Sequence, residues 1–298
     1  MARKTTELWH TGIVAAPIAG LMTSEALHAA DIRWLPDPGS FRFMADPFGI
    51  WRDGRLTVFV EALDYRIKRG EIHYVTFDAD GAVAAQGLAL REPFHLSYPV
   101  VLEDGGEVFM LPEGHRSGKL TLYRAGSFPD RWMPVQSLLD LPAIDASPVQ
   151  YNDRWWMFFA LPGDGNRAMR ELHVAFADTL RGRWRLHPAN PVRTALDSAR
   201  PGGTPFEHDG VLYLPTQDCV GGYGRGISLL RFDTLTEARV ETSVVSSLRP
   251  QGLRGGWDDG LHTLSAAGPV TLIDVKRLDP SPGRFWIDVQ RRLRRLLP

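Results

Sequence analysis

Residues 43–61 read FMADPFGIWRDGRLTVFVE, and this stretch decides the fold. Its first part is apolar and carries an Asp-Pro, and Asp53-Gly54 is typical of a tight hairpin turn. Leu56–Val60 then forms the returning strand. Because a hairpin brings the chain back to where it started, Asp46 and Glu61 are predicted to lie at the same rim of one sheet.

The same layout recurs along the chain at intervals of about fifty residues, the length of one four-stranded propeller blade. The copies start near residues 45, 97, 145, 199 and 260, and the first four align on Pro47, Pro99, Pro148 and Pro201. We therefore predict an all-β domain over residues 1–280, a five-bladed β-propeller. A strand at Gly12–Ala16 is expected to pair with the last blade and close the ring.

The composition of the chain limits the classes of function. The 298 residues are 44% hydrophobic, which supports a large core, and the formal net charge is -1. A nearly neutral chain has no global field to recruit nucleic acid, so nucleic acid is not an expected partner. The single cysteine, Cys219, excludes an internal disulfide and fits a reducing compartment. We predict a cytoplasmic protein, with a peripheral position at the inner membrane left open.

Residues 281–298 depart from the strand pattern. Apolar residues recur there at helical spacing, and the opposite face is basic through Arg291, Arg292, Arg294 and Arg295. The pattern predicts a short amphipathic helix, which could bind an anionic membrane surface or a partner enzyme. The alternative is a terminal helix whose apolar side packs on the propeller while its arginines are solvated.

Seven short elements together carry a resemblance to a known family. They are Ala45-Asp46-Pro47-Phe48, Ser97-Tyr98-Pro99, Leu111-Pro112-Glu113, Ile144-Asp145, Ala199-Arg200-Pro201, Gln217-Asp218-Cys219 and Leu261-His262-Thr263. This set resembles the N-terminal domain of plant glucosamine inositol phosphorylceramide transferases and its stand-alone bacterial relatives.

The resemblance implies a five-bladed propeller similar to that of furanosidases, arabinanases and invertase-like hydrolases, which use carboxylates at the central funnel. One departure from those hydrolases is Ser97-Tyr98-Pro99, where an Asp-Pro would be expected. The plant proteins carry a separate glycosyltransferase domain after this one, and this chain is expected to lack it. What the resemblance implies is therefore an association with glycan or glycolipid processing.

The candidate site follows from propeller geometry, because the innermost strand of each blade lines the channel. The inner strands are expected to contribute Asp46, Tyr98, Asp145, Arg200 and His262, and the second strands Glu61, Glu113 and Asp218. Crowded carboxylates raise one another's pKa, which suits acid–base chemistry.

Glycoside cleavage needs a carboxylic acid at the leaving oxygen and an ionised carboxylate that attacks the sugar or activates water. We predict Asp46 as the ionised base or nucleophile, Glu113 as the general acid and Asp145 as the group that tunes its pKa. The predicted substrate-binding residues are Glu61, Tyr98, Arg200, Asp218 and His262. The substrate is expected to be a carbohydrate or a glycolipid. No cofactor or metal motif is visible, although some related propellers hold a cation in the channel.

Each predicted site residue has a structural alternative. Asp46 could cap an Asp-Pro turn, and Glu61 could pair with a basic residue of the loop 66–69. Glu113 could form a loop salt bridge, and His262 could be a satisfied buried histidine. The alternatives to a glycoside hydrolase or transglycosidase are a glycan-binding propeller without catalysis and a sugar transferase that uses an activated donor.

Overall fold

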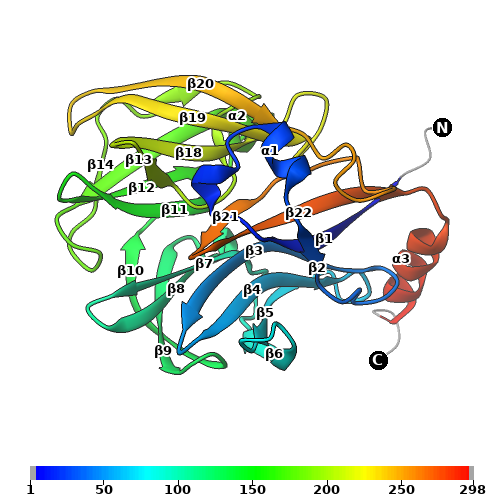
Figure 1. Ribbon diagram of the computed structural model, residues 1–298. Helices are drawn as coiled ribbons and strands as arrows, with labels where there is room; N and C mark the ends of the chain where they lie inside the picture. The colour runs from blue at the N-terminus through cyan, green and yellow to red at the C-terminus, as the bar shows by residue number, and fades with distance from the viewer. Residues whose placement is uncertain (1–4, 295–298) are drawn as a thin grey trace.

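The computed structural model describes residues 5–294, and its strands form five antiparallel sheets arranged as the blades of a propeller (Figure 1). Blade 1 contains β3 (Arg42–Arg52), β4 (Arg55–Asp64), β5 (Gly70–Phe77) and β6 (Val83–Leu90). Blade 2 contains β7 (Ser97–Asp104), β8 (Glu107–Glu113), β9 (Leu120–Ser127) and β10 (Arg131–Leu139). The predicted five-bladed β-propeller is confirmed.

The remaining blades are less regular. Blade 3 contains β11 (Ile144–Tyr151), β12 (Arg154–Ala160), β13 (Glu171–Ala177) and β14 (Arg185–Leu186), with β15 (Arg193–Thr194) also on β13. Blade 4 contains β16 (Arg200–Pro201), β18 (Val211–Asp218), β19 (Gly226–Leu235) and β20 (Val240–Leu248), with β17 (Phe206–His208) also on β18. Blade 5 contains β21 (Leu264–Ala267), β22 (Val270–Asp279), β1 (Thr6–Val14) and β2 (Ile32–Trp34).

The ring closes where β1 pairs with β22 from Thr6–Asp279 to Val14–Thr271. The closing strand was predicted, but at Gly12–Ala16, which is too late and too short. Two of its buried polar residues have internal partners: His10 Nε2 lies 2.6 Å from the Leu35 carbonyl oxygen, and Thr11 Oγ1 donates to the Met44 carbonyl oxygen at 3.0 Å. Buried polar groups with internal partners belong to the sheet, although in the sequence they interrupt the apolar run.

The helices are short and lie outside the blades. They comprise η1 (Ile18–Gly20), α1 (Ser24–Ala29), η2 (His115–Ser117), α2 (Arg167–Arg170) and α3 (Gly283–Arg294). The predicted C-terminal helix corresponds to α3, and Arg295 lies outside the described residues. The alternative in which the apolar side of this helix packs on the propeller is wrong, because Phe285, Trp286 and Leu293 are exposed.

The inner strands β3, β7 and β11 share one irregularity. Their register with the next strand shifts after Ala45, after Ser97 and after Ile144. The residues at these shifts are Asp46, Tyr98 and Asp145, with φ of 50°, 45° and 50°. Positive φ is uncommon for residues other than glycine, and it clusters at functional sites. A bulge of this kind re-aims a side chain, here at the same level of three blades.

These registers correct the predicted alignment of the blades. Asp46, Tyr98 and Asp145 are equivalent, and Pro47 and Pro99 follow the first two directly. Asp145 is followed by Ala146, so Pro148 lies two residues beyond the equivalent position. The alignment on Pro148 was wrong because nothing in the local sequence marks the bulge.

Candidate active site

A cavity of about 340 Å³, the funnel cavity, opens where β7 and β11 begin and where β4 and β8 end. Its volume is in the range of small-molecule sites. Its lining is rich in charged side chains. The residues that line it are Asp46, Glu61, Leu63, Tyr65, Lys68, His95, Ser97, Glu113, His115, Arg116, Asp145, Arg200 and Tyr223.

The structure brings five of the eight predicted site residues to this cavity: Asp46, Glu61, Glu113, Asp145 and Arg200. These residues come from blades 1, 2, 3 and 4, so the convergence predicted from propeller geometry is present in the structure.

The other three predicted residues lie elsewhere. The Tyr98 hydroxyl is buried and lies 2.8 Å from Ser147 Oγ, so it ties two blades together below the cavity. Asp218 turns away from the cavity and pairs with Arg249 at 2.6 Å. His262 is buried directly beside Asp46, with its Nε2 3.1 Å from Asp46 Oδ1.

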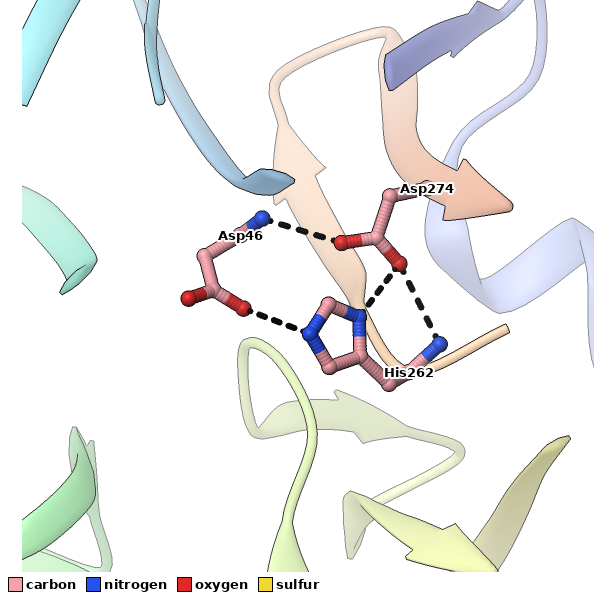
Figure 2. A group of neighbouring side chains, drawn as sticks. All are labelled: Asp46, His262 and Asp274. Atoms are coloured by element: carbon pink, nitrogen blue, oxygen red, sulfur yellow. Dashed lines mark hydrogen bonds and ion pairs between the residues drawn. The ribbon is translucent and has the colours of Figure 1, made fainter. Parts of the chain in front are cut away.

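Figure 2 shows His262 between two carboxylates, those of Asp46 and Asp274. Asp274 Oδ1 accepts hydrogen bonds from His262 Nδ1 at 2.7 Å, from the His262 amide at 3.2 Å and from the Thr263 amide at 3.1 Å. Asp274 Oδ2 accepts from the Asp46 amide at 2.9 Å. This fully buried carboxylate therefore fixes both of its neighbours.

The two carboxylates keep His262 charged. Burial alone lowers the pKa of His262, but Asp274 and Asp46 outweigh that effect and raise this pKa to about 10. An imidazolium between two acids donates from both nitrogens. Asp46 also accepts a hydrogen bond on Oδ2 from the Tyr98 amide at 3.2 Å. These contacts hold the Asp46 carboxyl group in place.

Among residues 5–294, one group of three side chains has the spacing of a possible metal site. Its possible ligand atoms, from Asp46, His262 and Asp274, all lie within 4.8 Å of one another. A metal ion there would need lone pairs that are already used. Both nitrogens of His262 face carboxylates, and Asp274 accepts four N–H groups. The donor set fits a hydrogen-bonded triad rather than a metal site.

Glu113 and Asp145 form a second cluster, in which two carboxyl groups are hydrogen-bonded to each other. Arg200 Nε lies 2.6 Å from Asp145 Oδ2, and Gln217 Nε2 donates to the same oxygen at 2.9 Å. His115 Nδ1 lies 2.7 Å from Glu113 Oε1. The predicted loop pairing of Glu113 is therefore present, and it belongs to the cavity wall.

The two acids of this pair differ in their pKa. Burial raises the pKa of Asp145 well above its usual value, and the Glu113 carboxylate raises it further, although Arg200 opposes both effects. Burial also acts to raise the pKa of Glu113, but hydrogen bonds from His115 and Asp145 lower it to about 2. These opposite shifts favour Asp145 over Glu113 as the carrier of a proton shared by the pair.

Glu61 is the remaining acid of the cavity, and its pKa is raised well above the usual value by burial and then by Asp46. Its nearest partner is His95, whose Nε2 lies 3.3 Å from Glu61 Oε1. His95 Nδ1 accepts from the Gly70 amide at 2.9 Å, which places the ring proton on Nε2. Of the basic residues in the following loop, Arg66 pairs with Asp64 and Arg69 with Glu71 rather than with Glu61.

Aromatic rings complete the site on the blade 5 side. The Trp9 ring stacks on His262 at a centroid distance of 3.7 Å, and the Tyr223 ring meets His262 edge-on at 5.3 Å. Arg200 lies 5.0 Å from the centroid of Tyr223, which lines the cavity. Tyr223 comes from the glycine-rich loop before β19 and lies close to His262 and Arg200.

The sequence interpretation missed His95, His115, Tyr223 and Asp274. His115 follows Glu113 by two residues, so its position could have been inferred from the blade motif. Asp274 is an acid in the middle of an apolar strand, which is itself a signal of a buried polar role. His95 and Tyr223 lie in loops, where no local pattern indicates their direction.

Residues 5–261 match the family model of the N-terminal region of glucosamine inositolphosphorylceramide transferase 1. The protein of that name from Oryza sativa subsp. indica is 36% identical over 257 residues, covering 82% of this chain and 34% of that protein. The Arabidopsis thaliana protein is 32% identical over 249 residues, covering 79% of this chain and 32% of that protein. The chain thus spans about a third of the length of these curated relatives.

Solved structures show the same fold. Zg3597, a family 117 glycoside hydrolase from Zobellia galactanivorans, superposes with a TM-score of 0.54 at 16% identity, covering 92% of this chain and 91% of that one. The catalytic domain of the Coprinopsis cinerea GH62 α-L-arabinofuranosidase gives 0.55 at 11% identity, covering 90% and 96%. At such identities the likeness concerns the fold alone. The predicted resemblance, in family and in fold, is confirmed.

Proposed function

We propose that this chain, which belongs to the family of the N-terminal region of glucosamine inositolphosphorylceramide transferase 1, is a carbohydrate-active enzyme. In the funnel cavity it hydrolyses a glycosidic bond of an envelope glycan or glycoconjugate, or transfers the glycosyl group of that bond to an acceptor. The observation that carries this proposal is the placement around one cavity of Asp46, which faces His262, and of the Glu113–Asp145 pair, in which the pKa of Asp145 is raised. Glycoside cleavage needs this combination of acid and base.

The proposed base and the proposed acid lie on different blades. Asp46 and Glu61 both belong to blade 1, whereas Glu113 and Asp145 come from blades 2 and 3. A sugar bound between them has the base on one side and the proton on the other. We therefore keep Asp46 as the base and assign the acid role to the Glu113–Asp145 pair rather than to Glu113 alone. Glu61, with a raised pKa, is suited to bind sugar hydroxyls.

The reaction can be written with these groups. The proton of the Glu113–Asp145 pair moves to the leaving oxygen as the bond between this oxygen and the anomeric carbon breaks. Water, or an acceptor hydroxyl, attacks the anomeric carbon, and its proton moves to Asp46. Arg200 stays paired with Asp145 throughout and stabilises the negative charge left on the pair.

The test is mass spectrometry of envelope oligosaccharides and glycolipids after incubation with wild-type protein, with Asp46→Asn and with Asp218→Asn. Asp218 is a matched control, because it ends a second strand as Glu61 does but pairs with Arg249 outside the cavity. We expect a product from the wild type and from Asp218→Asn, and a loss of at least about a hundredfold in rate for Asp46→Asn.

A glycan-binding propeller without catalysis is the second candidate. It is favoured by the fact that each acid of the cavity already has a protein partner: His262, His95, His115 or Arg200. If wild type and Asp46→Asn bind the same glycan and neither changes it, this candidate replaces the enzyme. A third candidate, a sugar transferase, is favoured by the names of the relatives and requires a product that forms only with an activated sugar donor. The cytoplasmic location stays a prediction.

A further inference from the structure

The helix α3 packs on the propeller through its charged side. The Arg284 guanidinium lies 3.9 Å from the centroid of the Tyr65 ring, and Arg291 Nη1 donates to the Tyr65 carbonyl at 3.2 Å. Asp288 holds both arginines, at 3.2 and 2.8 Å. The side chains of Arg284 and Arg291 are only 14% and 19% exposed. Arg284 and Arg291 are therefore packed against the protein and are not solvated as the sequence alternative expected.

The apolar side of α3 consequently faces solvent. Phe285, Trp286 and Leu293 are 62%, 60% and 55% exposed, whereas Ile287 is buried. At 100° per residue the three exposed side chains fall within an arc of about 100° on one face of the helix. Figure 1 shows α3, in red, at the outer edge of the propeller. We call this face of the helix the α3 stripe.

Basic residues lie beside the α3 stripe. The sequence of α3 contains four arginines against the single acid Asp288, and two of them, Arg284 and Arg291, pair with Asp288 on the packed side. Arg292 is exposed at the edge of the stripe. The loop that follows β4 adds exposed Arg66, Ile67 and Lys68, and Lys68 lies close enough to Asp288 to lower the pKa of Asp288.

The packed side of α3 lies next to the funnel cavity. Tyr65, on which Arg284 and Arg291 pack, lines this cavity, and so does Lys68. Among residues 5–294, no helix is long and apolar enough to cross a membrane, and α3 has 12 residues.

We propose that α3 docks the protein on an anionic lipid surface. Phe285, Trp286 and Leu293 enter the boundary between head groups and acyl chains, while Arg292 and Lys68 contact lipid phosphates. Aromatic and leucine side chains flanked by arginines are the composition of interfacial helices. This inference concerns a separate surface and does not depend on the proposed catalysis.

The test is co-sedimentation with vesicles of phosphatidylcholine and phosphatidylglycerol, and with vesicles of phosphatidylcholine alone. We expect the wild type to bind the anionic vesicles, and Phe285→Ala/Trp286→Ala to lower the partition coefficient at least about tenfold. Arg292→Gln should lower it about fivefold, and more salt should weaken binding. Trp51→Ala is the matched control. Trp51 is an exposed tryptophan, 38% accessible, at the hairpin end of β3, and its removal should leave binding unchanged.

Three outcomes overturn the inference. The wild type does not sediment with anionic vesicles; the double variant binds them as the wild type does; or the wild type is a dimer in solution that the double variant dissociates, which would make a second copy the occupant of the α3 stripe. Equal thermal unfolding of the wild type and the double variant establishes that the fold is intact. None of these outcomes bears on glycan turnover, which the Asp46→Asn experiment measures.

Discussion

Two acid clusters border the funnel cavity, and they differ in what lies between the acids. In the first, the His262 imidazolium separates Asp46 from Asp274, and backbone amides saturate Asp274. In the second, Glu113 and Asp145 touch each other, and Arg200 lies to one side. In the first cluster a cation lies between two carboxyl groups, whereas in the second the shifts move the pKa values of two neighbouring acids in opposite directions. Two kinds of acid cluster thus lie at one cavity.

The largest expected effect comes from breaking the first cluster at its buried end. Asp274→Asn leaves the His262 imidazolium with one buried carboxylate fewer and disturbs four hydrogen bonds. We expect the free energy of unfolding to fall by about 3–5 kcal/mol, the usual cost of removing one partner of a buried ion pair. Urea denaturation measures it.

Asp53→Asn provides the control for that substitution. Its side chain is 92% exposed at the hairpin of blade 1, so the same chemical change should alter stability by less than about 0.5 kcal/mol. A loss below about 1 kcal/mol for Asp274→Asn would mean that the triad is not a charged, fixed unit.

A second expected effect concerns the pH dependence of stability. The pKa of His262 is raised from 6.5 to about 10 in the folded state, so its contribution is full below pH 6.5 and is lost as pH rises towards 10. Stability should fall by up to about 1.4 kcal/mol per pH unit in this window. Urea midpoints from pH 6 to 10 measure the slope.

His262→Gln is the comparison for this pH dependence, because it removes the titrating ring and keeps a donor. This variant should be less stable than the wild type at pH 6.5 and should show a flatter pH profile above it. An unchanged slope in His262→Gln would assign the pH dependence to other groups, such as the buried Glu61.

The smallest expected effect concerns the second cluster. His115→Ala removes the hydrogen bond that helps to lower the pKa of Glu113 to about 2. The pKa of Glu113 and of the pair then rises, and the basic limb of the pH–rate profile, where the pair loses its proton, should move up by about one unit. His208→Ala, at a half-exposed position outside the cavity, should leave the profile where it is. An unmoved basic limb in His115→Ala would remove His115 from the acid assembly.

The fold could be predicted from the sequence because its signals are local. The hairpin at Asp53-Gly54 and the strand at Val83–Leu90 follow from turn residues and alternation, and the structure has both. The bulge at Asp145 could not be predicted, because it depends on pairing with β12 and not on the flanking residues. Because the bulge was not predicted, Pro148 was aligned with Pro47 and Pro99 although it lies two residues beyond the equivalent position.

The candidate site was predictable to the extent that strand ends determine it. Asp46, Glu61 and Glu113 lie at strand positions that open on the channel, and these residues line the cavity. Asp218 lies at the position in blade 4 that corresponds to Glu61, yet it turns to Arg249. Which way an acid turns is decided by a partner distant in sequence, and no local pattern reveals that partner.

The pairing of β1 with β22 also has a consequence during protein synthesis. Asp46 emerges from the ribosome early, but its partners His262 and Asp274 follow more than two hundred residues later. A nascent chain therefore carries Asp46 without the imidazolium that holds it and without the pairing that closes the ring. The complete triad cannot form before the last blade has been made.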